Sequence, residues 1–259
     1  MNIEAATCGA AGPPDGNDAK RKSRPAIAIF DLDGTLTRRD TFLAYLQFVL
    51  KRRIARVAQC ARLPWSVLLY QSGFRPRDWL KQDFVAAVLG GCSRAEVTAH
   101  TAAFVGQFGP GLIKPAALEV LRWHQSQSHR LMIASASLDI YALPLGTLWG
   151  ILEGVCTQVK WEADRITGVL DGPNLRGEAK LTAVKNALGL TAGDRPEIFA
   201  YSDHHSDLPL LKFADHGFAV DPTATLANCA PREGIRILRW TRHASRSSSS
   251  AQSRLGARS

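Results

Sequence analysis

Residues 26–37 read Ala-Ile-Ala-Ile-Phe-Asp-Leu-Asp-Gly-Thr-Leu-Thr, and this stretch determines the expected fold. The apolar run from Ala26 to Phe30 has the length and the boundaries of a buried strand. It ends on two carboxylates, Asp31 and Asp33, which repel each other and lose water on burial, so they need a cation or a protein partner to stay charged. Because ligands bind at the carboxyl ends of strands in an open parallel sheet, the pair predicts a binding site at that edge.

Strands and helices alternate in the second part of the chain. We expect a hairpin formed by residues 155–161 and 166–170. The other expected strands are residues 130–134, 197–201, 217–220 and 235–238, and the expected helices are residues 112–127, 138–149, 179–189 and 208–214. This alternation predicts an α/β fold with a doubly wound parallel sheet.

A helical block separates the first strand from the alternating part. The expected helices are residues 41–59, 77–89 and 94–108, with a strongly apolar stretch at residues 65–70. We therefore predict a core domain of residues 25–37 and 109–240, with residues 38–108 as a helical cap inserted after the first strand. Residues 1–24 and 241–259 are small, polar and charged, and are predicted to be disordered tails.

Composition and charge exclude several classes of protein. The chain has 259 residues, 46% of them hydrophobic and 21% charged, without the run of about 18 apolar residues that a spanning helix needs. The net charge is +9, but residues 1–25 and 241–259 supply +5 of it and no nucleic-acid-binding motif is present, so nucleic acid is not an expected partner. The cysteines are odd in number, widely spaced and without a CxxC pair, which predicts a reducing, cytoplasmic compartment: Cys8, Cys60, Cys92, Cys156 and Cys229.

Polar residues also follow other predicted strands or begin a helix. Ser135 follows one strand, Asp203 and Asp207 follow another, and Lys180 lies at the start of a helix. A parallel sheet brings these positions to one edge. Four carboxylates, a hydroxyl and a lysine suit phosphoryl transfer, because carboxylate oxygens bind Mg²⁺ and the other groups bind phosphate oxygens.

These motifs, in this order, resemble those of the haloacid dehalogenase superfamily. The resemblance covers about residues 26–240. The helical insertion, together with the segment 166–180, resembles the subclass that contains phosphoserine phosphatases. It implies a magnesium-dependent phosphomonoesterase that acts on a small phosphorylated substrate.

The resemblance also implies a role for each residue of the motifs. Asp31 would be the nucleophile that forms an aspartyl-phosphate, and Asp33 would protonate the leaving oxygen and then deprotonate water. The implied Mg²⁺ ligands are Asp31, the backbone carbonyl of Asp33, Asp203 and Asp207, and the implied phosphate-binding groups are Ser135, Lys180 and the backbone N–H groups that follow Asp31, including that of Gly34.

Simpler roles remain open for some of these residues. Asp31 and Asp33 could form a turn, Ser135 could be a helix N-cap with Ser137 as its functional rival, and Asp207 could cap the helix that follows it. Lys180 alone could be a solvated helix residue.

The second acidic motif departs from the family pattern. It begins Ser202-Asp203 where Gly-Asp is common, and His204 and His205 replace small residues. Without further His or Cys at zinc spacing, the two histidines are expected to be bystanders to the metal site. A non-catalytic binding protein on the same fold therefore stays open as an alternative.

The substrate stays open between two kinds of phosphate ester. Asp40 lies where phosphoserine phosphatases place an acid that meets the substrate amine, and Arg75 and Arg77 are candidates for the carboxylate. The insertion is also apolar and basic, at residues 42–53 and 63–70. It resembles members that act on phosphatidylglycerophosphate, and it could lie on an anionic membrane. The simpler alternative is that these residues form the core of the cap itself.

Overall fold

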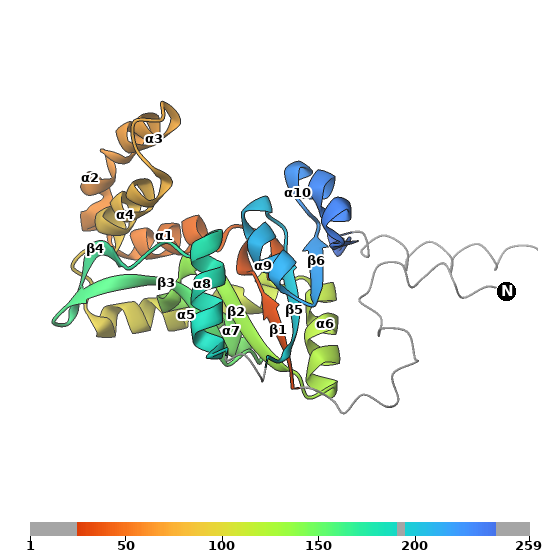
Figure 1. Cartoon of the computed structure of the whole chain (residues 1–259). Helices are drawn as coiled ribbons and strands as arrows, with labels where there is room; N and C mark the ends of the chain where they lie inside the picture. The colour runs from red at the N-terminus through yellow and green to blue at the C-terminus, as the bar shows by residue number, and fades with distance from the viewer. Residues whose placement is uncertain (1–24, 191–194, 242–259) are drawn as a thin grey trace, which may run out of the picture.

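The computed structural model describes residues 25–190 and 195–241, and places seven strands of that part of the chain in one sheet (Figure 1). The strand order is β4-β3-β2-β1-β5-β6-β7, and all neighbours are parallel except the antiparallel hairpin β3-β4. The strands are β1 (Ala26–Phe30), β2 (Arg130–Leu138), β3 (Glu153–Glu162), β4 (Arg165–Asp171), β5 (Glu197–Ser202), β6 (His216–Val220) and β7 (Arg236–Leu238). The predicted α/β fold with a mostly parallel sheet is confirmed. Of the tails predicted at residues 1–24 and 241–259, all but residue 241 lies outside the described residues.

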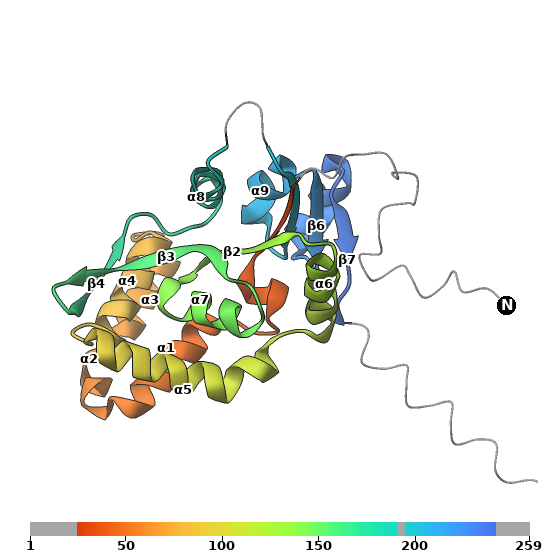
Figure 2. The same ribbon diagram turned by 90° about the horizontal axis from the view of Figure 1, so that it is seen from below.

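Helices cover both faces of the sheet (Figure 2). Side chains of a strand point alternately to its two faces. In β1, Ile27 and Ile29 therefore pack toward α8 and α9, whereas Ala28 and Phe30 pack toward α6 and α7. These helices are α6 (Pro115–Ser126), α7 (Asp139–Leu148), α8 (Glu178–Leu188) and α9 (Leu208–Phe213), and α10 (Ala224–Cys229) follows β6.

A run of helices lies between β1 and α6, where the sequence predicts an insertion. Its helices are α1 (Thr41–Arg52), α2 (Val57–Cys60), α3 (Leu63–Gln71), α4 (Arg77–Val88) and α5 (Arg94–Leu112). Helix α4 packs on β4 at Gly168, where an added Cβ would lie 2.6 Å from the Cβ of Ala86. No helix of the described residues is long and apolar enough to cross a membrane.

The helix predicted at residues 41–59 is wrong beyond Arg52. Arg53 leaves the helical region, with φ −124° and ψ 57°, and its guanidinium donates to the carbonyl of Val88 at 2.9 Å. This tertiary contact turns the chain into a short 3-10 segment (Ile54–Arg56) and α2.

Two other predicted boundaries move. Helix α5 continues through Pro110 to Leu112, where a bridge between Thr37 and Ile113 ends it, so its predicted end at residue 108 is wrong. Strand β2 runs past Ala134 to Leu138, with a register shift against β3.

A buried histidine determines part of the pH dependence of stability. His124 of α6 is fully buried against Phe30 and Phe199, with Nε2 2.9 Å from the Tyr201 hydroxyl and Nδ1 2.8 Å from Nδ1 of His129. Burial first, and then His129, lowers the pKa of His124 to about 3 from an ordinary 6.5. The unfolded chain binds a proton at this residue below pH 6.5 and the folded chain does not, so acid favours unfolding.

We expect His124→Gln to remove this pH dependence. Between pH 7 and pH 5, the natural chain should lose about 2 kcal/mol more of its free energy of unfolding than the variant does, because each pH unit below 6.5 costs about 1.4 kcal/mol per depressed histidine. Reversible urea unfolding of both chains measures the difference. Parallel losses in the two chains would contradict the assignment.

Candidate active site

The residues that the sequence selects meet in one cavity at the carboxyl edge of the sheet. The cavity has a volume of about 350 Å³. Among its lining residues are all eight predicted site residues: Asp31, Asp33, Gly34, Asp40, Ser135, Lys180, Asp203 and Asp207. Strands β1, β2 and β5 and helix α8 supply most of them, so segments far apart in sequence converge as a parallel sheet requires.

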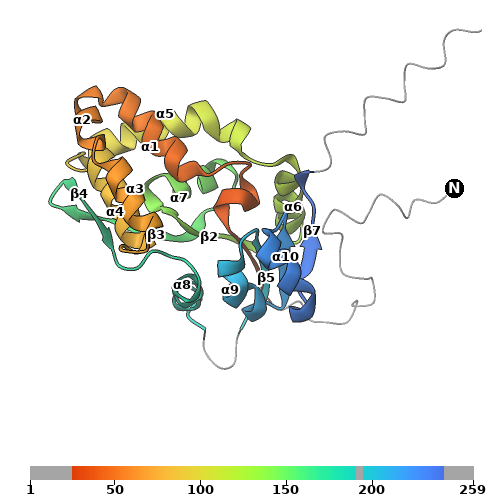
Figure 3. The same cartoon turned by 90° about the horizontal axis from the view of Figure 1, so that it is seen from above.

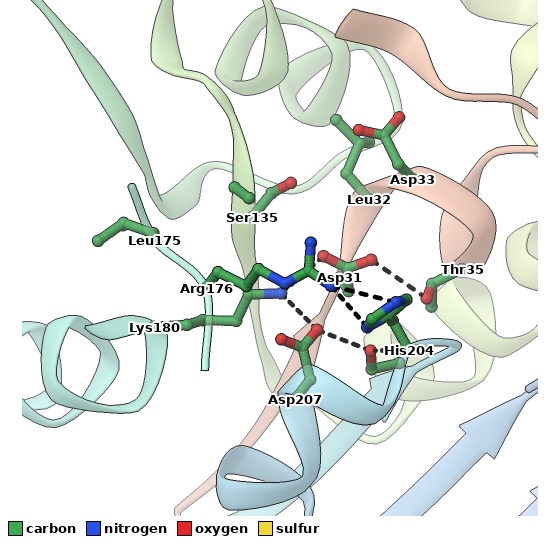
Figure 4. Close-up of polar contacts among 12 residues, drawn as sticks. Asp31, Leu32, Asp33, Thr35, Ser135, Leu175, Arg176, Lys180, His204 and Asp207 are labelled. Carbon is green, nitrogen blue, oxygen red and sulfur yellow. Dashed lines mark hydrogen bonds and ion pairs between the residues drawn. The ribbon is translucent and has the colours of Figure 1, made fainter. Parts of the chain in front are cut away.

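Lys180 lies between two buried carboxylates (Figure 4). Its Nζ is 2.7 Å from Oδ1 of Asp31 and 2.5 Å from Oδ2 of Asp207, and Ser202 Oγ donates to the same Asp207 oxygen at 2.7 Å. Burial acts to lower the pKa of Lys180, but the charges of Asp207 and Asp31 outweigh it and raise that pKa. The lysine is therefore a fixed cation and not a solvated helix residue.

Asp31 retains an excess of negative charge around it. Burial, opposed by Lys180 and reinforced by the charges of Asp207 and Asp203, raises the pKa of Asp31 to about 7. Burial likewise raises the pKa of Asp203 to about 6. Three carboxylates share one lysine, so the site favours binding of a further cation.

Asp33 is held by hydrogen bonds at both oxygens. Thr41 donates to Oδ1 from its backbone N–H and its hydroxyl, both at 2.7 Å, and Ser137 Oγ donates to Oδ2. Burial nevertheless raises the pKa of Asp33. A carboxyl group in this state suits proton transfer.

The turn after β1 brings Asp203 next to Asp31. Gly34 has φ +80°, and a Cβ there would lie 2.3 Å from Oδ2 of Asp203, so only glycine allows this approach. The hydroxyl of Thr35 is 3.4 Å from both Oδ2 of Asp31 and Oδ1 of Asp203. Two carboxylates therefore face a common space beside the backbone of residues 33 and 34.

This donor set fits Mg²⁺, which prefers oxygen ligands and is commonly bound by one or two carboxylates while it keeps several waters. No group of three His, Cys, Asp or Glu side chains in residues 25–190 and 195–241 is arranged as a complete metal cage. Asp207 contacts Lys180 and Ser202. Asp31 and Asp203 instead each have an oxygen 3.4 Å from the Thr35 hydroxyl, so these two carboxylates lie on either side of the same space.

The simpler roles can now be compared with the contacts. Asp207 makes no side-chain cap to α9, and the N-cap position of α7 is Leu138, not Ser135. Ser135 Oγ is buried and accepts from the N–H of Ser137 at 3.1 Å. Asp40 does cap a helix, because its carboxylate accepts from Leu43 N at 3.1 Å at the start of α1, although it also lines the cavity.

Sequence reasoning named one cation on the outer part of the cavity, Arg77, and missed two others, Arg176 and Lys81. Arg176, which lies within the quoted segment 166–180, places Nη2 3.1 Å from Nε2 and 3.2 Å from Nδ1 of His204. Burial first, and then Arg176, lowers the pKa of His204 to about 4, so its ring is neutral near pH 7. Arg77 and Lys81, one turn apart on α4, line the same cavity.

Lys81 also connects the helical insertion with the sheet. Its Nζ donates to the carbonyl of Ala136 and, at 2.6 Å, to Oδ1 of Asn174, whose amide donates to Asp78 at 2.9 Å. Burial lowers the pKa of Lys81 to about 8. The sequence offered one signal for Lys81, namely its position one turn after Arg77 on a predicted helix. This spacing alone does not show that this face of the helix meets the site.

Known proteins match this chain over most of its length. The family model described as haloacid dehalogenase-like hydrolase matches residues 28–212. A histidinol-phosphatase from Neisseria meningitidis serogroup C (strain 8013) is 29% identical over 220 residues, which cover 83% of this chain and 98% of that protein.

Two solved structures share the fold. A protein of unknown function from Bordetella pertussis Tohama I has a TM-score of 0.74 at 23% identity, over 83% of this chain and 99% of that one. A phosphoserine phosphatase with a phospho-aspartyl intermediate analogue has a TM-score of 0.54 at 17% identity, over 84% and 94%. The chain therefore belongs to the haloacid dehalogenase-like hydrolases, as its four motifs predict.

Proposed function

We propose that this hydrolase is a magnesium-dependent phosphomonoesterase that acts on a small phosphorylated metabolite through an aspartyl-phosphate. The observation that carries the proposal is the buried carboxylate of Asp31, which lines the cavity and is held by Lys180 at 2.7 Å. A carboxylate positioned by a cation beside a pocket is suited to nucleophilic attack. The histidinol-phosphatase relative and the phosphoserine phosphatase structure support the same class of reaction.

The two aspartates divide the chemistry. A carboxylate oxygen of Asp31 attacks phosphorus, the bond from phosphorus to the leaving oxygen breaks, and Asp33 gives its proton to that oxygen. Asp33 then takes a proton from water, and the water oxygen attacks phosphorus, so that inorganic phosphate leaves and the Asp31 carboxylate is restored. Thr41 and Ser137 keep Asp33 in place for both proton transfers.

Mg²⁺ would be held by Asp31, Asp203 and the backbone carbonyl of Asp33, with Asp207 as a direct or water-mediated contributor. When bound, it neutralises charge on the phosphoryl group. By hydrogen-bonding Lys180, Asp207 also fixes the lysine against Asp31.

The phosphate oxygens would be bound by donors of the chain itself. Ser135 Oγ, Lys180 Nζ and the N–H of Gly34 line the cavity beside Asp31. Fixed donors of this kind stabilise the charge that develops in the transition state.

The outer part of the cavity bears on the choice of substrate. Arg77 and Arg176 can bind a carboxylate or a second phosphate, and Asp40 can meet an amine. Phosphoserine carries both of these groups, whereas histidinol phosphate has the amine without a second anion. We propose phosphoserine as the first candidate and histidinol phosphate as the comparison that tests it.

The helical insertion of residues 38–108 would act as the cap domain that selects this substrate. It supplies Phe42, Arg77 and Lys81 to the cavity wall, and Lys81 fixes it to the backbone after Ser135. Substrate closure by such a cap excludes water from the reaction.

A second candidate is a lipid phosphate such as phosphatidylglycerophosphate. It is favoured by the apolar side chains that α3 exposes, Trp65 and Leu68, a short distance along the chain from Arg77 of the cavity wall. Such a substrate would bring its second phosphate to Arg77 and Arg176.

A substrate panel tests the proposal. It contains p-nitrophenyl phosphate, phosphoserine, histidinol phosphate, a sugar phosphate, a nucleotide and phosphatidylglycerophosphate in detergent, each with Mg²⁺ and with chelator. We expect phosphate release that requires Mg²⁺, and the highest kcat/KM identifies the substrate. Absence of turnover of every compound, in a chain that binds Mg²⁺, would contradict it.

Removal of either outer arginine should affect substrate binding more than chemistry. We expect Arg77→Ala and Arg176→Ala to raise KM for phosphoserine about tenfold or more, because each loses a hydrogen bond between charged groups, with kcat little changed. KM for histidinol phosphate should change little. The exposed Arg232 supplies a matched control, Arg232→Ala, which should alter neither value.

A further inference from the structure

The helical insertion carries a strong imbalance of charge. Residues 41–77 contain seven Lys and Arg residues and no Asp or Glu. Among the described residues, only one of these seven forms an ion pair with a carboxylate, namely Arg62 with Asp83 at 2.9 Å. Lys51 and Arg75 are exposed and Arg56 is half-buried, so the segment presents positive charge that is not paired with carboxylates of the described residues.

The same segment exposes most of the large apolar side chains at the surface. Six such side chains in the described residues are more than half exposed, and five of them lie within residues 54–74. The five are Ile54, Val57, Trp65, Leu68 and Phe74, and the sixth is Leu152, between α7 and β3. We call the five residues, with Arg56 and Arg75, the apolar tip.

Helix α3 explains why these side chains are left uncovered. Ser66 and Arg62 attach one side of it to α4 through Asp83. Trp65 and Leu68 lie on turns of the same helix but stay exposed. Figure 1 shows α2 and α3 at the outer end of the insertion, away from the sheet. The expectation that these residues form the core of the cap is therefore wrong for Trp65 and Leu68, which no other element covers in the described chain.

We propose that the apolar tip docks on an anionic lipid bilayer. Exposed Trp, Leu and Phe side chains beside Arg and Lys are suited to the boundary between headgroups and acyl chains, and anionic headgroups supply the charge that the segment lacks. A second copy of this chain fits less well, because two such surfaces would bring like charges together.

The cavity lies on the same side of the molecule as the apolar tip. The parallel strands end toward α3 in Figure 1, and Arg77, two residues after Arg75, lines the cavity. The view from above in Figure 3 shows α3 and α4 beside β3 and β4. Docking would place the cavity near the bilayer, whether the substrate is a lipid or a soluble metabolite, so the proposal is independent of the substrate.

Vesicle sedimentation of the full chain tests the proposal without any turnover. The probes are vesicles of phosphatidylcholine alone and of phosphatidylcholine mixed with phosphatidylglycerol. We expect binding to the mixed vesicles that weakens as salt is added. The double variant Trp65→Ser and Leu68→Ser should bind at least about tenfold more weakly, while Leu152→Ser, which loses a still more exposed leucine elsewhere, should bind like the natural chain.

Charge reversal distinguishes vesicle binding through the apolar tip from binding through positive charge elsewhere on the chain. Arg56→Glu with Arg75→Glu should lower binding to the mixed vesicles about tenfold or more, because each basic residue near an anionic surface favours binding several-fold. Lys160→Glu, at an exposed position of β3, should have a clearly smaller effect. Thermal unfolding checks that all variants fold.

Two results would overturn the proposal. One is equal vesicle binding by the natural chain and the variants of the apolar tip. The other is that these variants change a dimer into a monomer in light scattering while vesicle binding stays the same, which would identify a second copy as the partner.

Discussion

Asp31→Asn is expected to lower kcat by on the order of 10⁴-fold or more for every phosphate ester, because an amide cannot form the acyl-phosphate bond. The expected loss exceeds that of any other single change in the cavity. It should not depend on the leaving group, since the nucleophile is needed for all of them. Phosphate release from p-nitrophenyl phosphate under saturating Mg²⁺ measures it.

A measurement of thermal stability distinguishes this loss of activity from unfolding of the variant. The pKa of Asp31 is raised to about 7, so above that pH the charged carboxylate destabilises the folded chain. Asn removes the charge, and Asp207 still pairs with Lys180. The Asp31→Asn variant should therefore melt at the same temperature as the natural chain or higher, at pH 8 with chelator. Retained turnover in this variant would contradict the nucleophile assignment.

Asp33→Asn should lower kcat by roughly 10²- to 10⁴-fold, the range typical of general acid–base catalysis. Here the leaving group matters. An alkyl phosphate such as phosphoserine needs a proton on its leaving oxygen, whereas p-nitrophenolate leaves without one, so the loss should be clearly larger for phosphoserine. Comparison of kcat/KM for the two compounds measures this difference, because kcat/KM reports the steps up to departure of the leaving group and not the later hydrolysis that both compounds share.

A matched control uses an aspartate outside the cavity. Asp164 lies in the exposed turn between β3 and β4, and Asp164→Asn should change neither kcat. Equal losses of kcat/KM for both esters in Asp33→Asn would contradict the assignment of Asp33 as the acid that protonates the leaving oxygen.

The sequence predicted the part of this molecule that local pattern determines. Two patterns were enough to predict the α/β sheet: an apolar strand that ends on carboxylates, and the alternation of strands and helices after residue 109. They also predicted which residues converge, namely Asp31, Ser135, Lys180 and Asp203. A parallel sheet places the carboxyl ends of its strands on one edge, so no distance had to be known.

Tertiary contacts determined what the sequence missed. The break after α1 depends on the bond from Arg53 to Val88, which lies 35 residues later. The hydrogen bond of Ser137 with Asp33 exists because β2 continues past Ala134, and an apolar pattern cannot show where a strand between two neighbours ends. Lys81 reaches the cavity only because the insertion folds back over the sheet, whereas Arg176 reaches it from the loop between β4 and α8.

The central claim is that Asp31 carries the phosphoryl group. Its most direct test is to quench the chain in acid during turnover of p-nitrophenyl phosphate and to map the modified peptide by mass spectrometry. We predict a phosphoryl group on Asp31 that hydroxylamine removes, and its absence in Asp31→Asn. Phosphate release by the natural chain with no modified Asp31, or with the group on another residue, would contradict it.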